Sequence, residues 1–178
     1  MTELELIKKA RKNPEAFDCL YRKYYPKINA FVFHRVGSED IRQEIVSNTF
    51  FKAMNKITLF RILEARRTSF SAWLYRIAVN EIAQYYRRNS SRSKMLENYK
   101  SISEQDGEKM DYPLFEKVKL LMDDLKEEEK NLLTLRFFEK LSFAEIAEIM
   151  KKKENAVKVR THRILKKLRE KIGDNYEL

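Results

Sequence analysis

The sequence predicts an all-α protein built from two helical domains that a flexible linker joins. Glycine and proline are scarce, with three of each among 178 residues, so few positions interrupt a helix. Apolar residues recur at the three- and four-residue spacing of an amphipathic helix, and no run alternates convincingly with the period of a strand. A hydrophobic fraction of 43% is sufficient to form the cores of such helical domains.

The composition limits the partners and the compartment of the protein. A formal net charge of +10 favours a polyanionic partner, either nucleic acid or an anionic membrane surface. The single cysteine, Cys19, excludes an internal disulfide framework, and its place between Phe17 and Leu20 predicts a buried thiol. Since there is no signal peptide and no long apolar run, we expect a cytoplasmic protein without membrane insertion.

The first domain, residues 1–88, opens with clear helix signals. A short helix is predicted after Thr2. Asn13 as N-cap and Pro14 at the first helical position mark the start of the next helix. Pro26 is expected to break or kink that helix, because proline lacks the backbone N–H that the helix needs.

Gly37 and Ser38 separate this helix from the third one, as a C-terminal stop and an N-cap. The third helix carries acids in its first turn, where the helix dipole favours them, and is predicted to end near Lys56. Residues 58–69 are ambiguous and could be a loop with a helical turn.

The last helix of the first domain is predicted over Phe70 to Arg88. An aromatic stripe at helical spacing is more often core than ligand site, so we expect Trp73 to be buried. Aromatic and basic groups interleave elsewhere on the surface of this helix, a mixture that suits single-stranded nucleic acid. These residues are Tyr75, Arg76, Asn80, Tyr86, Arg87 and Arg88.

A linker is predicted over residues 89–112, which are rich in serine, asparagine and charge and lack apolar periodicity. The second domain, residues 113–178, is predicted to open with a helix at Pro113. Three acids, Glu127 to Glu129, then occupy the first turn of the following helix.

A helix-turn-helix is predicted at the end of the chain. Ser142 and Glu145 have the spacing of a capping box, which starts its first helix, and a short turn follows at residues 151–153. The second helix is predicted to turn Val157, Ile164, Leu165 and Leu168 inward. Its opposite face carries Asn155, Lys158, Val159, His162, Arg163 and Lys166.

Positive charge concentrates on this second helix. Residues 151–172 contain ten lysines and arginines against two acids, a net of +8. This favours a recognition helix that neutralises DNA phosphates. The alternative is a solvated basic helix in a three-helix bundle, because charged helix faces are common.

Four fragments, in this order, resemble bacterial sigma factors of the compact extracytoplasmic-function (ECF) group, in the sigma-70 family. The resemblance covers almost the whole chain, with the linker between the second and third fragments. The fragments are EIVSNTFFKA, FSAWLYRIAVNEIAQYYRR, LKEEEKNLLTLRFFEKLSFAEIAEIM and NAVKVRTHRILKKLRE.

The resemblance implies a protein that binds core RNA polymerase, directs it to promoters and helps melt DNA. The first domain would recognise the −10 element, through Tyr75, Arg76, Asn80, Arg87 and Arg88. The second domain would recognise the −35 element, through Lys153, Asn155, Lys158, Val159, His162, Arg163 and Lys166. Glu44, Ser47 and Asn48 match the segment that docks on the clamp helices of the largest polymerase subunit. An anti-sigma factor is a further possible partner, which would hold the two domains closed.

Three departures from the family's pattern bear on the site. Ser47 and Asn48 replace a Gln-Glu pair, which removes one carboxylate from the proposed docking face. Residues 151–153 are all lysine and replace Gly-Ile-Ser, which removes the turn glycine and an N-cap serine, at a cost of roughly 0.5–2 kcal/mol for the cap. Thr161 replaces a leucine that faces the core, so looser packing of the recognition helix is expected.

Other chemistry has little support in the sequence. His34 and His162 are far apart, and no Cys/His cluster is present, so no zinc site is expected. No phosphate-binding glycine loop or nucleophile motif occurs, so we expect no enzyme and no cofactor. No homo-oligomer is expected.

Two other functions remain open from the sequence. A helix-turn-helix regulator would bind duplex DNA without polymerase. A helical adaptor would bind an acidic partner and ignore DNA sequence. The basic recognition helix argues against the adaptor, and the aromatic and basic Phe70–Arg88 helix argues against the plain regulator.

Overall fold

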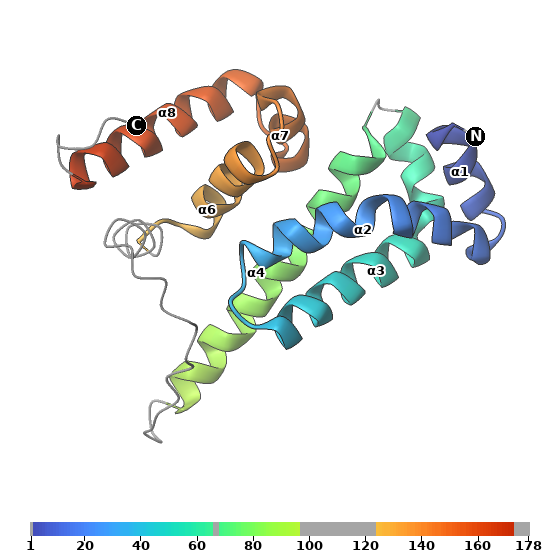
Figure 1. The fold of residues 1–178 in the computed structure, drawn as a ribbon, viewed down its shortest axis with the longest axis horizontal. Coiled ribbons are helices and arrows are strands. Elements are labelled where there is room, and N and C mark those ends of the chain that lie inside the picture. The colour runs from blue at the N-terminus through green and yellow to red at the C-terminus, as the bar shows by residue number, and fades with distance from the viewer. Residues whose placement is uncertain (1, 66–67, 97–123, 173–178) are drawn as a thin grey trace.

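The computed structural model describes residues 2–65, 68–96 and 124–172, and all regular structure in these ranges is helical (Figure 1). This confirms the all-α class. The N-terminal elements are α1 (Glu3–Ala10), a 3-10 turn (Pro14–Ala16), α2 (Phe17–Phe33), α3 (Glu39–Ala65) and α4 (Phe70–Leu96). The C-terminal elements are α6 (Glu127–Leu133), a π-helical turn η2 (Thr134–Phe138), α7 (Phe143–Met150) and α8 (Glu154–Ile172). The helix predicted at Pro113 lies outside the described residues.

The predicted helix starts of the N-terminal part are confirmed. Thr2 caps α1 in a reciprocal capping box with Glu5, and the Asn13 side chain accepts a hydrogen bond from the Glu15 N–H. Pro26 was predicted to break or kink the helix, and the break is wrong, because α2 continues through Pro26. Proline has no backbone N–H, so one carbonyl in the preceding turn lacks its helical hydrogen bond. Pro26 lies on the exposed face, where water can bond this carbonyl instead.

The two long helices extend beyond their predicted ends. α3 does not stop near Lys56, because Ile57 and Phe60 continue its buried stripe. The Phe60 ring lies 5.3 Å from that of Phe70 and 5.1 Å from that of Trp73, which confirms Trp73 as a core residue. α4 runs past Arg88 to Leu96, so the first residues of the predicted linker are helical.

One burial prediction in the N-terminal part is wrong. Cys19 is exposed, because the buried positions of this part of α2 are Phe17, Leu20 and Tyr24, which leaves the thiol on the outer face.

The helix-turn-helix is formed as predicted. Ser142 and Glu145 make the capping box, with the Ser142 N–H donating to Glu145 Oε2 at 2.8 Å and the Glu145 N–H donating to Ser142 Oγ at 3.2 Å. Lys151 ends α7 in the left-handed conformation, with φ of 55° and ψ of 43°. The turn therefore adopts the backbone of a glycine cap with a lysine in its place.

The inner face of α8 is close to the prediction. Val157 and Ile164 are buried, and so is Thr161, whose hydroxyl donates to the Val157 carbonyl at 2.9 Å. Leu165 was expected inside, but 37% of it is exposed, because the adjacent Ile164 occupies the inner position.

The C-terminal helices pack directly on the N-terminal bundle. α7 contacts α4, and η2 contacts α2, as their neighbouring positions in Figure 1 also show. Among the residues that the structure describes, no helix is both long and apolar enough to span a membrane.

Candidate nucleic-acid interface

Helix α8 presents a continuous polar stripe to solvent. Six of the seven residues predicted to bind the −35 element lie on it, three or four positions apart, so they share one face over three turns. The seventh, Lys153, is exposed in the turn before the helix. The stripe consists of Asn155, Lys158, Val159, His162, Arg163 and Lys166, and all of them are exposed.

The stripe stays positively charged, because the ion pairs that its lysines form are weak. Lys158 Nζ lies 2.7 Å from Glu154 Oε1, and Lys166 Nζ lies 3.9 Å from Glu170 Oε1. Both pairs are exposed and four residues apart, so each is worth only a few tenths of a kcal/mol and yields readily to a phosphate. The stripe can therefore offer its cations to a polyanion, while Val159, 50% exposed, can make apolar contacts.

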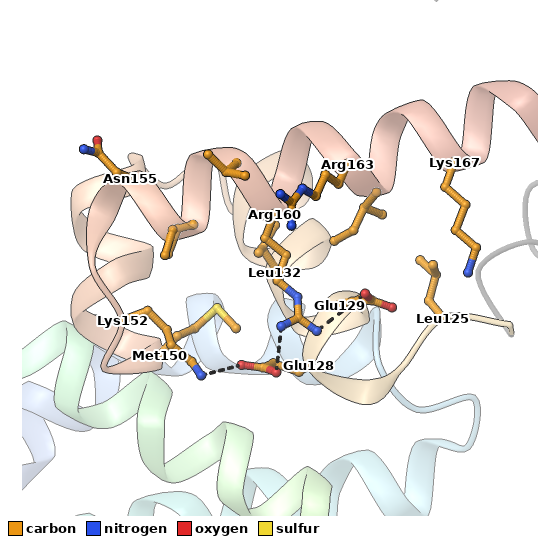
Figure 2. Close-up of a pocket in the computed structure, with 14 residues that line it drawn as sticks. Leu125, Glu128, Glu129, Leu132, Met150, Lys152, Asn155, Arg160, Arg163 and Lys167 are labelled. Atoms are coloured by element: carbon orange, nitrogen blue, oxygen red, sulfur yellow. Dashed lines mark hydrogen bonds and ion pairs between the residues drawn. The ribbon is translucent and has the colours of Figure 1, made fainter.

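A groove of about 660 Å³ runs beside the stripe, between α8 and α6 (Figure 2). Leu125, Leu132 and Met150 line it together with basic side chains of α8. Arg160 points into this groove, with its guanidinium 3.4 Å from Glu128 and 3.5 Å from Glu129, and 38% of its side chain stays exposed. Arg160 thus links α8 to α6 through its two acidic partners, and Arg163 lines the same groove one turn further along α8.

The residues on α4 that were predicted to bind the −10 element fall into two groups, which differ in solvent exposure. Asn80, Arg87 and Arg88 are exposed. Tyr75 is buried and Arg76 is half-buried, and both bond to residues of the C-terminal helices, so the expectation that Tyr75 lies on the surface is wrong for this arrangement. Only 1% of Tyr75 is exposed, and its hydroxyl donates to Glu139 at 2.8 Å. Burial raises the pKa of the Tyr75 phenol well above its usual range, and the hydrogen bond to Glu139 raises it further.

Arg76 reaches the C-terminal end of α7. Its Nη2 donates to the carbonyl of Glu148 at 2.7 Å and its Nε to that of Ile149 at 3.3 Å. Burial lowers the pKa of the Arg76 guanidinium, and the nearby Glu148 carboxylate opposes this shift. A cation at these carbonyls satisfies groups that a helix end leaves without partners and complements its negative dipole.

The three residues predicted to bind polymerase straddle a ridge of α3. Glu44 and Asn48 line a hollow of about 200 Å³, shared with Glu81 and Arg88 of α4. Ser47 faces a larger groove of about 540 Å³ on the other side. Since Arg88 borders the hollow of Glu44 and Asn48, the predicted polymerase and −10 residues adjoin.

The larger groove is aromatic, a feature that residue spacing alone does not predict. Tyr21, Tyr25 and Phe51 line it and are 38%, 36% and 60% exposed. The sequence carries a weak signal for this aromatic groove, because Tyr21 and Tyr25 are four residues apart and share a helix face. Only the fold shows that this face meets α3 without being covered by it.

The described residues contain no group of three or more His, Cys, Asp or Glu that could hold a metal ion. His34 lies against the Phe138 ring, 4.2 Å between centroids, and His162 lies on the α8 stripe.

Two stretches of the chain match known protein families. Residues 20–92 match the family model of Sigma-70 region 2, and residues 121–170 match that of Sigma-70, region 4. Among curated relatives, the ECF RNA polymerase sigma-E factor of Escherichia coli (strain K12) is 31% identical over an alignment of 164 positions, and the alignment covers 84% of this chain and 83% of the relative.

A longer relative aligns with nearly all of the chain. The ECF RNA polymerase sigma factor BldN of Streptomyces coelicolor is 26% identical over an alignment of 178 positions, and the alignment covers 97% of this chain but only 66% of that protein. Among solved structures, the sigma factor RpoE in complex with the anti-sigma factor NepR from Bartonella quintana has a TM-score of 0.61 at 19% identity. It covers 90% of this chain and 98% of that chain, so the two share a fold.

Proposed function

Because the chain belongs to the ECF group of RNA polymerase sigma factors, in the sigma-70 family, and directs promoter-specific transcription initiation by RNA polymerase, we propose that its two domains read separate promoter elements. Residues 1–88 bind core polymerase and the −10 element, and residues 113–178 bind the −35 element. Residues 89–112 form the linker between these two domains. The family consists of initiation factors rather than catalysts, and this chain works in the cytoplasm without a catalytic group of its own.

The observation that carries the −35 assignment is the exposed α8 stripe. A helix fits the major groove of B-DNA, and its exposed polar face meets base edges while flanking lysines and arginines meet phosphates. On the stripe, Asn155 and Arg163 have side chains that can form paired hydrogen bonds to base edges. Lys153, Lys158 and Lys166 are suited to phosphates, and Val159 to a thymine methyl group.

The −10 assignment rests on α4. Extruding a base from the stack costs a few kcal/mol, which a capturing site must recover through stacking and hydrogen bonds. Asn80 supplies an amide for a base edge, and Arg76, Arg87 and Arg88 supply charge for the backbone. The ridge of Glu44, Ser47 and Asn48 docks on the clamp helices of the largest polymerase subunit.

An anti-sigma factor is a further partner that we propose. The related solved structure of RpoE contains the anti-sigma factor NepR. In this chain the aromatic groove of Tyr21, Tyr25 and Phe51 adjoins the polymerase ridge, so a protein that covers it would also block polymerase.

Run-off transcription tests the function. Purified bacterial core RNA polymerase, this chain and a library of random promoters should give products that require the chain and share two spaced sequence elements. No products, together with stable sequence-specific duplex binding by the chain alone, would instead support a regulator that acts without polymerase.

Two arginines three residues apart on α8 test the −35 site. Arg163→Ala should weaken binding to a duplex that carries the −35 element shared by the run-off products. If Arg163 contacts a base edge, the loss is about 1–3 kcal/mol. If it contacts a phosphate, the slope of log K against log salt concentration should fall in magnitude by about 1. Arg160→Ala is the matched control, because Arg160 pairs with Glu128 and Glu129 inside the domain. Equal losses of DNA affinity for the two variants, at equal folded fraction, would contradict the stripe assignment.

A further inference from the structure

Helix α1 ends in a run of basic residues that the assigned promoter and polymerase sites do not use. Residues 8–12 read Lys-Lys-Ala-Arg-Lys, with no acid among them. Lys8, Lys9 and Lys12 are exposed, and the Lys12 N–H donates to the Lys9 carbonyl at 2.9 Å, so the helical turn extends to Lys12. Lys12 follows the other two lysines by three and four positions, so all three share one side of the helix. We call these three residues the α1 lysine patch.

The acids of α1 are engaged elsewhere and leave the patch charged. The Glu5 carboxylate accepts from the Thr2 N–H at 2.8 Å in the capping box. Glu3 accepts from the Tyr24 hydroxyl at 2.6 Å and pairs with Lys23. Within the described ranges, no carboxylate forms an ion pair with a lysine of the patch. The patch therefore keeps its three positive charges for a polyanion outside the chain.

The dipole of α1 explains only part of this charge. A cation in the last turn of a helix contributes about 0.3–1 kcal/mol, and Lys8 and Lys9 occupy that turn. Lys12 lies beyond the C-cap residue Arg11, where the effect of the dipole falls off. The run of cations thus extends past the helix end that it would complement.

Both ends of α1 are anchored to the aromatic core beneath the start of α4. The Arg11 guanidinium lies 5.9 Å from the centroid of the Phe60 ring, which lies 5.3 Å from that of Phe70. At the other end, Glu3 bonds to Tyr24, whose ring also lies 5.3 Å from that of Phe70. Phe70 is the first residue of α4, so the patch has a fixed position relative to the −10 residues.

The patch lies at the end of α4 that faces downstream on the proposed assignment. The −35 element is upstream of the −10 element, and the −35 domain follows the C-terminal end of α4 in the chain. That end of α4 therefore meets the upstream side of the −10 element, and its N-terminal end meets the downstream side. Helix α1 packs on α3 beside the start of α4, far from the Leu96 end (Figure 1). A strand captured on α4 continues past α1.

We propose that the α1 lysine patch binds phosphates of the single-stranded DNA immediately downstream of the −10 element. Three ammonium groups on an anchored helix turn suit the phosphates of an unpaired strand and need no particular base. These contacts hold the strand after it leaves α4 and so stabilise the melted region without reading its sequence. The inference deepens the proposed function and rests on it, since it concerns the same DNA strand.

A triple variant and a matched control isolate the patch. Lys8→Gln/Lys9→Gln/Lys12→Gln removes three charges and keeps side chains that favour a helix. The control, Arg22→Gln/Lys27→Gln/Lys140→Gln, makes the same change of charge at exposed residues outside α1 and outside every assigned binding residue. Both variants are compared with the parent as full chains bound to bacterial core polymerase, at equal folded fraction.

Two forked DNA probes test where the patch binds. Both carry the promoter elements shared by the run-off products. The unpaired non-template strand ends with the −10 element in one probe and continues downstream in the other. We expect the parent and the control to bind the longer probe more tightly than the shorter one, and the triple variant to bind both equally.

The salt dependence counts the phosphates. Each lost contact to a single strand should reduce the slope of log K against log salt concentration by about 0.7, which gives about 2 for three lysines. Between about 50 and 200 mM salt, the parent should therefore lose roughly 20-fold more affinity for the longer probe than the triple variant loses.

A tethered iron chelate locates the patch on the DNA directly. The chelate is attached at Lys9→Cys in a Cys19→Ser background, because the native thiol of Cys19 is exposed. Hydroxyl radicals should cleave the non-template strand downstream of the −10 element. Cleavage confined to the upstream side would contradict the proposed path of the strand.

Three binding results would overturn the inference. The triple variant could keep the preference of the parent for the longer probe, or the control could lose that preference equally. The triple variant could also lose affinity for core polymerase without DNA, which would assign the patch to polymerase. Run-off transcription keeps the proposed function separate, because a parent chain that gives no products counts against that function, whereas an active parent with an indifferent patch counts against this inference alone.

Discussion

At the scale of single residues, two lysines flank α7 in a conformation that suits glycine. Lys140 has a φ of 54° and Lys151 a φ of 55°. A side chain in the left-handed region costs roughly 1–2 kcal/mol, because its Cβ crowds the following carbonyl. The helix-turn-helix therefore carries a strain that its sequence does not relieve.

Replacing Lys151 by glycine should stabilise the protein. We expect Lys151→Gly to raise the free energy of unfolding by about 0.5–1 kcal/mol in urea titrations of the full chain, since the relief of strain exceeds the entropy cost of glycine. Lys151→Ala is the control, because it removes the lysine and keeps the Cβ. If both variants change stability equally, the effect belongs to the lysine side chain and the backbone argument is wrong.

Thr161 and Leu165 show how single residues depend on the fold. Thr161 was expected inside and is 3% exposed, with its hydroxyl satisfied by the Val157 carbonyl. A buried hydroxyl that bonds within its own helix avoids the desolvation penalty of an unpaired group. Leu165 was expected inside together with Ile164, but only Ile164 is buried, and 37% of Leu165 is exposed.

At the scale of elements, the capping box of α7 links helix stability to pH. The Ser142 hydroxyl and the Ser142 N–H both donate to Glu145, and these bonds lower the pKa of the Glu145 carboxyl. A lowered pKa in the folded state means that the stabilisation is complete above the unfolded pKa of about 4.3. It is lost as the pH falls through the lower folded pKa.

The expected result is a pH-dependent effect of Glu145→Gln. At pH 7 the substitution should lower the free energy of unfolding, and the difference from the parent chain should shrink as the pH falls below about 4. Urea unfolding at several pH values measures it. In a Ser142→Ala background, which itself costs about 0.5–2 kcal/mol, the pH dependence of the Glu145→Gln effect should be reduced. A difference that stays constant from neutral to acid pH would contradict the assignment.

Elements were predicted most reliably where local signals were complete. The start of α7 followed from the predicted capping box and that of α1 from the position of Thr2, and both are confirmed. The ends of α3 and α4 were misplaced, because no glycine or proline marks them and the helices extend until packing or charge stops them. Pro26 does not break α2, since the carbonyl that loses its hydrogen bond lies on the exposed face, where water can bond it.

At the scale of the whole molecule, the contact between the two domains decides which surfaces are available. The α8 stripe and the α3 ridge are accessible, whereas part of the α4 face is covered. A single arrangement thus gives the three predicted binding faces different accessibilities.

Core polymerase should shift this arrangement. With spin labels at the exposed Cys19 and at Arg169→Cys, adding saturating bacterial core polymerase should lengthen the distance between the domains, because promoter elements about 25 base pairs apart, or roughly 85 Å along B-DNA, cannot be read by a closed chain. The labelled chain must first be shown to support run-off transcription. A distance that is unchanged in a transcriptionally active complex would show that the domains need not separate.

The sequence by itself determined the helical class, the two fragments of each domain and the basic stripe of α8, because these depend on residue spacing within one helix or on short motifs. Tertiary structure alone decided that Tyr75 is covered, that Arg35 pairs with Asn131 and Glu127, and that α4 and α7 cap each other. Arg35 and Asn131 are 96 residues apart. No local periodicity encodes such a pair, since it forms only when two separately folded surfaces meet in one orientation.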